Sequence, residues 1–422
     1  MALARSFSPS SRRIWSSTKC LPKPFVRLFV VCLVCIIFVI HLSTRQPPNH
    51  PPFEPPNLDL TINGQNIHQV PTLYPLHPFP HTPIQKPLED ENDTTPKPWL
   101  TAVVSAACDV ERRMLIRSTW MHLYRDLPFD RRFVVSNPGP NWTEIVAMEN
   151  RTFGDMIVLD HLQEDHITAN TVKTLELYKW LLGQNRTYEF VSKIDTDLWL
   201  NARGFWDRFL VPRLSINEEG RVTSAVERTI IGQLYYSNKG LTFPHGSIYT
   251  VTWDIVELLV ELQNQFNVVV PEDMAVGLLM LKGRQTVNFV NFRGTEKFDY
   301  ADGDSRQDGT AWARKATHSQ GSLHALSGED VIAVHQLKDK ALWFKVAECF
   351  DESGLKKMSE GPEGRPSNLM LWHDFWNWMG VDGPLRPRVD RIPQHFWSEE
   401  NGSWIVDGVW NMGKTKTGYI EP

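Results

Sequence analysis

Apolar runs and amphipathic stretches alternate along the chain from Trp99 to Asp195. The strand-like runs are 99–106, 132–136, 155–159 and 188–194, and the helix-like stretches between them are 111–124, 143–149 and 168–182. Strands that alternate with helices predict an α/β layered domain built on a mostly parallel sheet. Ligands of such sheets bind beyond the carboxyl ends of the strands. The pattern therefore constrains both the fold class and the place where functional residues should lie.

Two aspartates, in the sequence Asp195-Thr196-Asp197, follow the last of these strands. Burying charge beside a strand is costly unless a partner neutralises it. A divalent cation such as Mg²⁺ or Mn²⁺ is a natural partner, because it prefers oxygen ligands and bridges carboxylates to phosphates. The pair therefore suits a nucleotide-sugar transferase that holds a diphosphate leaving group. By itself it also fits an ordinary surface turn, so the flanking sequence has to decide.

The chain begins with a basic segment that is followed by an apolar run. Residues 1–24 contain basic residues and no acidic ones, so we expect them to form a cytosolic tail. Residues 25–42 are about long enough to cross a thin bilayer, and we expect an uncleaved transmembrane signal anchor there, with the bulk of the chain in the secretory lumen. A cleaved signal peptide is the alternative, but residues 41–45 make a poor cleavage site.

Composition divides the rest of the chain into three parts. Prolines dominate residues 43–98, which predicts an extended stem, and the catalytic domain is expected over 99–350. Within it, the polar and glycine-rich stretch 294–330 is expected to be a mobile excursion. Residues 351–422 form a tryptophan-rich extension that should pack on the catalytic domain. We expect its tryptophans to serve packing rather than sugar stacking: Trp372, Trp376, Trp378, Trp397, Trp404 and Trp410.

Other sequence features agree with a lumenal glycoprotein. Five glycosylation sequons follow the expected anchor, at Asn92, Asn141, Asn150, Asn185 and Asn401. Two cysteines, Cys108 and Cys349, belong to the lumenal part, and they either form one disulfide or remain free thiols. The formal charge is −5 with 22% charged residues. This composition does not indicate the strongly basic surface that a nucleic-acid-binding protein needs.

Several motifs occur in a fixed order between residues 99 and 340. They are Arg113-Met114-Leu115-Ile116-Arg117-Ser118-Thr119-Trp120, Glu149-Asn150-Arg151-Thr152-Phe153-Gly154-Asp155, Lys173-Thr174 with Trp180, Lys193-Ile194-Asp195-Thr196-Asp197, and Glu272-Asp273 with Gly277. In this order they resemble the β-1,3-galactosyltransferase superfamily, which includes β-1,3-N-acetylglucosaminyltransferases and Fringe-type enzymes; its fungal-looking members are the most similar. The resemblance implies a GT-A fold and inverting transfer from a UDP-sugar, with Mn²⁺ on the diphosphate.

The resemblance also implies roles for individual residues. Asp197 is the first metal ligand, Asp195 contacts the metal indirectly or holds the ribose, and His335 matches the family's metal-binding histidine. His335 could instead be a structural hydrogen-bonding residue. Inversion needs a base that takes a proton from the acceptor hydroxyl. That role falls to Asp273, with Glu272 as the alternate, although an acid at the start of a helix also interacts favourably with the helix dipole.

Four residues are candidates for binding the donor. Arg113 and Arg117 share one helical face, and arginine suits phosphate recognition, although a solvated basic face is the alternative. Asp155 either faces the uridine or ribose or ends a turn, and Lys193 either pairs with the carboxylates or contacts the donor. At the acceptor site, Gly246 and Tyr249 correspond to a glycine–tyrosine segment of the family.

These observations predict a single-pass type II glycosyltransferase of the Golgi membrane. It would transfer a hexose or N-acetylhexosamine, with galactose the first choice, to a glycan on protein or lipid through a β-1,3 linkage. The sequence does not indicate an oligomeric state. A metal-dependent phosphoesterase is one alternative, but the chain lacks the His-rich ligand set of a two-metal site. A catalytically inactive relative that binds glycans or scaffolds other transferases is the other, and the two retained acidic pairs argue against it.

Overall fold

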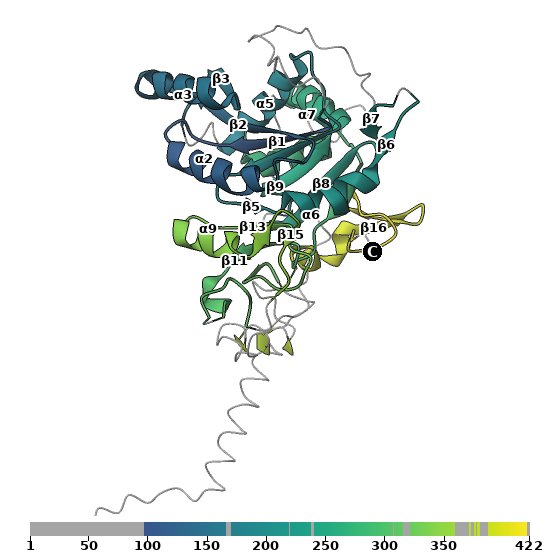
Figure 1. The fold of residues 1–422 in the computed structure, drawn as a ribbon. Coiled ribbons are helices and arrows are strands. Elements are labelled where there is room, and N and C mark those ends of the chain that lie inside the picture. Colours follow the sequence, from purple (N-terminus) through teal and green to yellow (C-terminus); the bar gives the residue numbers. More distant parts are fainter. Residues whose placement is uncertain are drawn as a thin grey trace, which may run out of the picture. The chain divides into compact units, whose positions relative to one another are not determined.

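A computed structural model describes most of the chain from residue 97 to residue 419 (Figure 1). Within this span it does not describe residues 166–169, 219, 238–239, 307, 315–320, 359–370, 373–374, 377 and 380–386. The expected cytosolic tail, anchor and stem, and the sequon at Asn92, lie outside the described residues. Among the residues that are described, no helix is both long and apolar enough to span a bilayer.

A ten-stranded sheet forms the centre of the domain. Its strand order is β16-β17-β18-β10-β8-β9-β4-β1-β2-β3. Strands β1 (Trp99–Val104), β2 (Phe129–Asn137), β3 (Met156–Gln163) and β4 (Phe190–Asp195) are mutually parallel, as the alternating pattern predicts. The expectation of a mostly parallel sheet is confirmed, with the exception that β9 (Thr242–Thr252) runs antiparallel to both β4 and β8 (Thr229–Tyr236). A direct hairpin connection between β8 and β9 imposes that direction.

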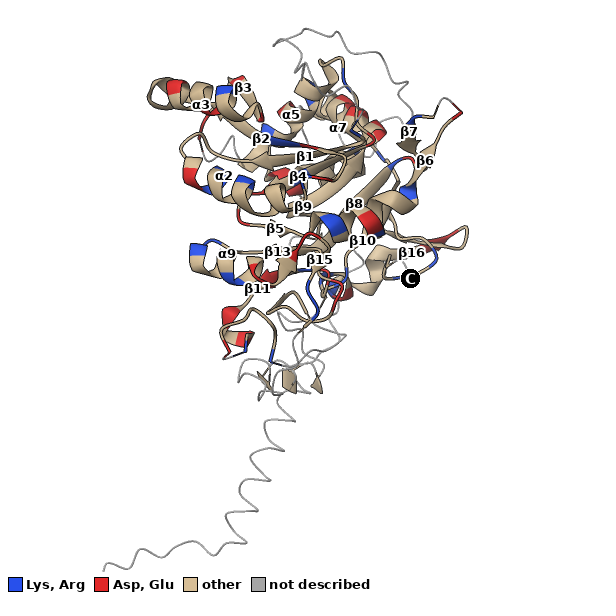
Figure 2. Ribbon diagram, viewed as in Figure 1, with Lys and Arg blue, Asp and Glu red and all other residues tan. Residues whose placement is uncertain are grey.

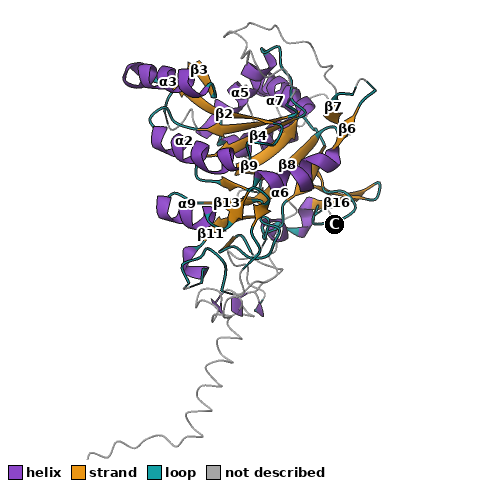
Figure 3. Cartoon of the chain, in the orientation of Figure 1, coloured by secondary structure: helices purple, strands orange, loops and turns teal. Residues whose placement is uncertain are grey.

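Helices cover both faces of this sheet (Figure 3). One apolar core lies under α2 (Val110–Ile116) and α3 (Gly139–Phe153). The other lies under α5 (Lys173–Leu182), α7 (Trp253–Phe266) and α8 (Glu272–Lys282). Helix α3 begins earlier than the sequence suggested, because Pro140 stands in its first turn, where a missing N–H costs nothing. It ends at Gly154, whose φ of 66° suits a glycine cap.

A second, four-stranded sheet adjoins the central one, in the order β12-β11-β13-β5. Its strands are β5 (Trp199–Leu200), β11 (Lys297–Tyr300), β12 (Leu323–His324) and β13 (Ala333–His335). Helix α9 (Lys340–Ala347) packs against it. The expected mobile excursion over 294–330 is therefore wrong for β11 and β12, because Phe298 of β11 and His324 of β12 are fully buried. The stretch is so polar that it shows little alternation of apolar and polar residues, and the sequence pattern therefore did not indicate these strands.

Shorter elements complete the described fold. They are α6 (Ala202–Phe205), β6 (Leu214–Ile216), β7 (Val222–Ser224), β10 (Val287–Asn291), β14 (Phe350–Asp351) and β15 (Gly354–Leu355). Basic and acidic residues are interspersed over the described elements (Figure 2), in keeping with the small net charge.

The tryptophan-rich extension is part of the central sheet. Strands β16 (Trp397–Glu400), β17 (Ser403–Val406) and β18 (Trp410–Asn411) continue the sheet beyond β10. Trp410 is fully buried and donates through its Nε1 to Thr242 Oγ1 over 2.8 Å. The packing interpretation is therefore right for Trp410, and it is wrong for Trp372 and Trp378, whose side chains are exposed.

Cysteines and sequons occupy varied environments. Cys108 and Cys349 are free thiols, the first exposed and the second buried, so the disulfide hypothesis is wrong for this structure. Asn141, Asn185 and Asn401 are exposed, as a glycan acceptor must be. Asn150 is half-buried and its Oδ1 accepts a hydrogen bond from the Met156 amide over 3.0 Å, so this sequon is the least suited to carry a glycan.

Asp407, in the turn between β17 and β18, gives a stability prediction. Burial raises the pKa of its carboxyl to about 6, although Thr242 donates to it over 3.1 Å. Because the folded pKa exceeds the unfolded one, the stabilisation due to this group is complete below about pH 4 and is lost as the pH rises through 6. We expect Asp407→Asn to raise the free energy of unfolding by about 1–2 kcal/mol at pH 8 and hardly at all at pH 4.

Urea unfolding followed by tryptophan fluorescence at the two pH values measures this difference. Asparagine tolerates the left-handed backbone at this position, where φ is 55°. Asp207→Asn, at an exposed position, is the control and should change stability by less than about 0.5 kcal/mol at either pH. Equal effects of Asp407→Asn at pH 4 and pH 8 would contradict the assignment of a buried, protonated acid.

Candidate functional site

Two aspartates lie at the carboxyl edge of the central sheet. Strand β4 ends at Asp195, which is level with Val104 at the end of β1. The chain then turns through Thr196 and Asp197 into β5 of the second sheet. The side chain of Asp195 is 37% exposed and that of Asp197 is 17% exposed, so both remain within reach of a ligand. This is the place where parallel strands bind their ligands.

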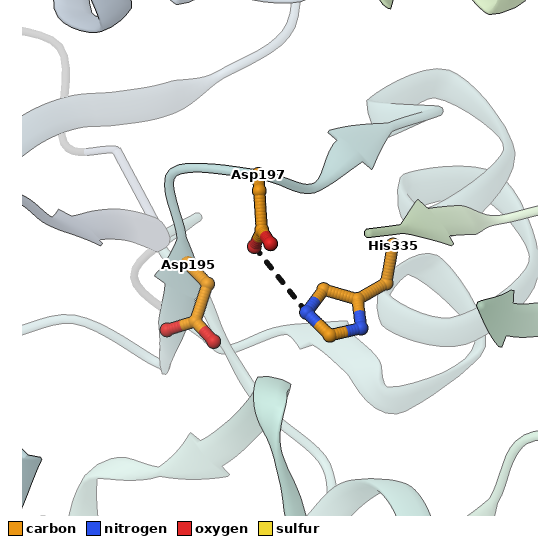
Figure 4. A group of neighbouring side chains, drawn as sticks. All are labelled: Asp195, Asp197 and His335. Atoms are coloured by element: carbon orange, nitrogen blue, oxygen red, sulfur yellow. Dashed lines mark ion pairs between the residues drawn. The ribbon is translucent and has the colours of Figure 1, made fainter. Parts of the chain in front are cut away.

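His335 completes a group of three with these aspartates (Figure 4). It ends β13, which pairs antiparallel with β5 just beyond Asp197. The Leu337 amide also donates to the Asp197 carbonyl over 2.9 Å, which ties the two turns together. His335 Nε2 lies 3.3 Å from Asp197 Oδ1, and one ligand atom from each of the three side chains lies within 4.8 Å of the others. Two carboxylates and one imidazole form a donor set that fits Mn²⁺ or a similar divalent cation.

The charges of this group reinforce one another. Burial opposes ionisation of Asp197, but the hydrogen bond and charge of His335 lower the pKa of that carboxyl overall. Burial likewise opposes protonation of His335, yet hydrogen bonds to Asp197 and Asp299 raise the pKa of its imidazole. Asp299 lies on the other side of the ring, with its Oδ1 2.7 Å from His335 Nδ1. The Asp197 carboxylate is thus held ionised, as metal coordination requires.

Lys193 joins the aspartates to a second acidic group. Its Nζ lies 2.7 Å from Asp195 Oδ1 and 3.2 Å from Glu272 Oε2, and it donates to the Gly246 carbonyl. The amine is buried, which alone would lower its pKa, but Asp195 and Glu272 together raise that pKa. Lys193 therefore pairs with the carboxylates, which was one of the two roles left open for it.

The acids Glu272 and Asp273 open helix α8 and differ sharply in environment. Glu272 is buried and both its oxygens are engaged, one by Tyr249 and the other by Lys193. Asp273 is half-buried; its Oδ1 accepts from the Met274 amide over 2.8 Å and its Oδ2 accepts a longer, 3.3 Å bond from the Gly246 amide. Burial raises the pKa of both carboxyls. Of the two acids, Asp273 is the more accessible to a substrate.

Close packing of α8 on β9 places these acids. A Cβ at Gly277 would collide with the Thr242 carbonyl oxygen, so only glycine lets the helix lie this near the strand. A Cβ at Gly246 would come within 3.1 Å of Asp273 Oδ2. The glycines therefore bring the start of α8 against the residues that hold Lys193.

Comparison with known proteins identifies the domain. The family model described as Galactosyltransferase matches residues 111–288, a segment that contains Asp195, Asp197 and the acid pair of α8. Residues 111–288 are therefore similar to galactosyltransferases. The chain is accordingly a glycosyltransferase. His335 lies beyond the matched segment, on β13.

Comparison with solved structures gives only distant similarities. The galactosyltransferase LgtC, solved in complex with donor and acceptor sugar analogues, is 13% identical, with a TM-score of 0.35, 62% of this chain covered and 98% of LgtC covered. Mouse xyloside xylosyltransferase 1 in its apo form is 9% identical, with a TM-score of 0.27, and the match covers 49% of this chain and 88% of that one. Comparison with curated proteins gives no match. At such low TM-scores these structural similarities do not support any further conclusion about the chain.

Three of the expected donor-binding residues lie elsewhere in the galactosyltransferase domain. Arg117 is bidentate to Asp155 over 2.7 and 2.8 Å and lies between the rings of Phe133 and Phe153. Met156, next to Asp155, is level with Ile194 but three strand spacings away, about 14 Å. Arg117 and Asp155 thus pair with each other at a distance from the aspartates, and their expected contact with the donor stays a prediction.

Arg113 supports the site without reaching it. Its guanidinium is fully buried, pairs with Glu149 over 2.7 Å and donates to Ser105 Oγ over 3.0 Å and the Ala107 carbonyl over 3.0 Å. A buried arginine with so many partners cannot contact a donor directly, so that expectation is wrong. It instead holds the loop that follows β1, at the edge of the sheet where Asp195 lies.

The two expected acceptor residues differ in availability. Tyr249 is fully buried and donates to Glu272, so it cannot touch an acceptor, and that prediction is wrong. Gly246 is half-buried between Lys193 and Asp273. Because Gly246 lies beside the half-buried Asp273, its contact with the acceptor stays a prediction.

Sequence reading missed three residues that surround His335. Lys297 and Asp299 lie on β11, which pairs with β13 so that Asp299 is level with His335. His245 lies with its ring centroid 5.6 Å from that of His335, and Lys297 Nζ is 3.1 Å from His245 Nδ1. No local motif marks these positions. Only recognition of β11 as a strand beside β13 could have found Asp299.

Proposed function

We propose that this glycosyltransferase transfers a hexose or N-acetylhexosamine from a UDP-sugar to a glycan hydroxyl, with inversion and with dependence on Mn²⁺ or a similar cation. Galactose is the first choice of sugar and a β-1,3 linkage the first choice of product. A place in the Golgi membrane, as a single-pass type II protein with its catalytic domain in the lumen, belongs to the same proposal.

One observation carries the proposal. Lys193 Nζ contacts Asp195 and Glu272 at 2.7 and 3.2 Å, so the candidate metal group and the acids of α8 form one continuous site. A transferase needs both parts side by side, because the acceptor oxygen attacks the anomeric carbon while the diphosphate leaves from its opposite side. A bound divalent cation, held by Asp195, Asp197 and His335, would supply charge stabilisation for that leaving group.

Other residues of the site would accept the proton of the acceptor and hold the geometry of the site. Asp273 takes the proton of the acceptor hydroxyl as the new carbon–oxygen bond forms and the bond to the UDP oxygen breaks. Its raised pKa, caused by burial, makes it a stronger base than an exposed aspartate. Glu272 and Lys193 are a buried ion pair that fixes the geometry of Asp195 and of Gly246.

The choice of donor is the decisive experiment. We expect the purified full-length chain with Mn²⁺ to consume one member of a set containing UDP-galactose, UDP-N-acetylglucosamine and UDP-glucose, and chelation of the metal should abolish turnover. If none of these donors is turned over and none binds with dependence on Mn²⁺, the proposal fails and an inactive glycan-binding or scaffold protein becomes the better account.

A further inference from the structure

The C-terminal segment reaches the candidate metal group through Arg388. This residue opens the short helical turn Arg388–Arg391 directly after Pro387. Its Nη2 lies 3.2 Å from Asp299 Oδ2, and its guanidinium carbon lies 4.4 Å from the centroid of the Tyr235 ring on β8. Only 11% of its side chain is exposed. An arginine so enclosed is held in place on two sides rather than free at the surface.

Asp299 connects this arginine to His335. Its Oδ1 is 2.7 Å from His335 Nδ1 and 3.6 Å from Lys297 Nζ, whereas its Oδ2 is contacted by Arg388. A carboxylate on one imidazole nitrogen fixes the ring and directs the other nitrogen toward its own ligand. Here the other nitrogen, Nε2, faces Asp197. The chain of contacts thus runs from the C-terminal segment to the candidate metal ligands in two steps.

We propose that Arg388 is a positioning residue: by holding Asp299 it sets the orientation of His335 and so tunes the affinity of the site for its divalent cation. This inference rests on the proposed function, since it concerns the metal of that site. Lys297 contacts the Oδ1 side of Asp299, so it leaves the Oδ2 side to Arg388. Segment 387–391, which lies about 50 residues beyond His335 and outside the matched family segment, would then be part of the active-site machinery.

The test measures Mn²⁺ binding directly. We expect Arg388→Met, which keeps an unbranched apolar stem and removes the charged guanidinium, to raise the Kd for Mn²⁺ in the presence of UDP by about 10-fold, the lower end of what loss of an outer partner costs. Electron paramagnetic resonance of free Mn²⁺ with the full-length protein gives this constant without turnover. At saturating Mn²⁺ the kcat should recover to within about twofold. The Kd of Arg388→Lys for Mn²⁺ should lie between those of the wild type and Arg388→Met, because an ammonium can keep one contact to Asp299.

Two further variants keep the result interpretable. Lys416→Met removes another C-terminal cation that lies over aromatic rings, those of Trp397 and Trp404, and should leave Mn²⁺ binding unchanged. Asp299→Asn should also raise the Kd for Mn²⁺. This variant tests the same chain of contacts independently of whether Arg388→Met folds well. Because both act through one chain of contacts, the double variant should be no worse than Asp299→Asn alone.

The outcomes separate this inference from the proposed function. Wild-type protein that shows no Mn²⁺ binding with UDP contradicts the proposed function itself. Wild-type protein that binds Mn²⁺, together with an unchanged Kd in Arg388→Met, overturns only the role of Arg388. An equal rise in Lys416→Met would also overturn it, because the effect would then be a general loosening of the C-terminal segment.

Discussion

Replacement of Asp197 by alanine is expected to lower kcat/KM for the UDP-sugar by more than about 100-fold and to abolish Mn²⁺-dependent binding of UDP. Asp197 is the carboxylate nearest His335 Nε2, at 3.3 Å, and it is held ionised by that neighbour. Loss of an outer-shell partner costs about 10–100-fold in metal affinity or activity, so loss of a direct ligand should cost more. Steady-state kinetics and calorimetric titration with UDP, each with and without Mn²⁺, measure both effects.

A matched acid serves as control for this experiment. Asp207 is exposed, lies on the helical segment Trp206–Leu210, and is not one of the three candidate metal ligands. Asp207→Ala removes the same charge and should leave kcat/KM and UDP binding within about twofold of wild type. If Asp197→Ala retains Mn²⁺-dependent binding of UDP, the aspartates of the β4–β5 turn do not hold the metal.

Replacement of Asp273 by asparagine should lower kcat by about 100- to 10,000-fold, the contribution expected of a general base. The amide oxygen of asparagine can still accept from the Gly246 or Met274 amide, so the start of α8 should keep its geometry. Binding of UDP and Mn²⁺ should therefore be unchanged. In the wild-type enzyme the rate should fall as the pH drops through the pKa of Asp273, which burial places above the usual range of an aspartate.

Glu272→Gln distinguishes the neighbouring acid. Glu272 forms a buried ion pair with Lys193, and breaking such a pair costs about 3–5 kcal/mol of stability because one charge stays buried without its partner. We therefore expect Glu272→Gln to lower the melting temperature markedly, whereas Asp273→Asn should change it little. If Asp273→Asn still transfers the sugar at the wild-type rate, Asp273 is not the general base and another residue must have that role.

The sequence predicted the parts of the site that local patterns encode. A buried strand that runs into two aspartates, and two acids at the start of a helix, are recognisable because strand ends and helix starts have their own residue preferences. The structure places both features where the pattern indicated, on β4 and α8. Lys193 was a candidate because it belongs to the same sequence motif as Asp195 and Asp197.

The failures have a common physical origin in long-range pairing. Arg113 and Arg117 do share one helical face, but their partners, Glu149 and Asp155, come from a different helix and strand, and only the tertiary fold shows that the charges cancel. Asp299 was assigned to a mobile stretch because β11 has no strong alternation. Its strand exists because β13 pairs with it. Such pairings cannot be read from spacing along a single chain.

We propose that Asp195, Asp197 and His335 together hold one divalent cation on the diphosphate of a nucleotide. Crystals of the protein grown with Mn²⁺ and UDP, measured at a wavelength where manganese scatters anomalously, test it most directly. We expect an anomalous peak within bonding distance of Asp197 and His335 Nε2, in contact with the UDP phosphates. An ordered UDP with its manganese elsewhere, or with these side chains turned away from it, would contradict the account.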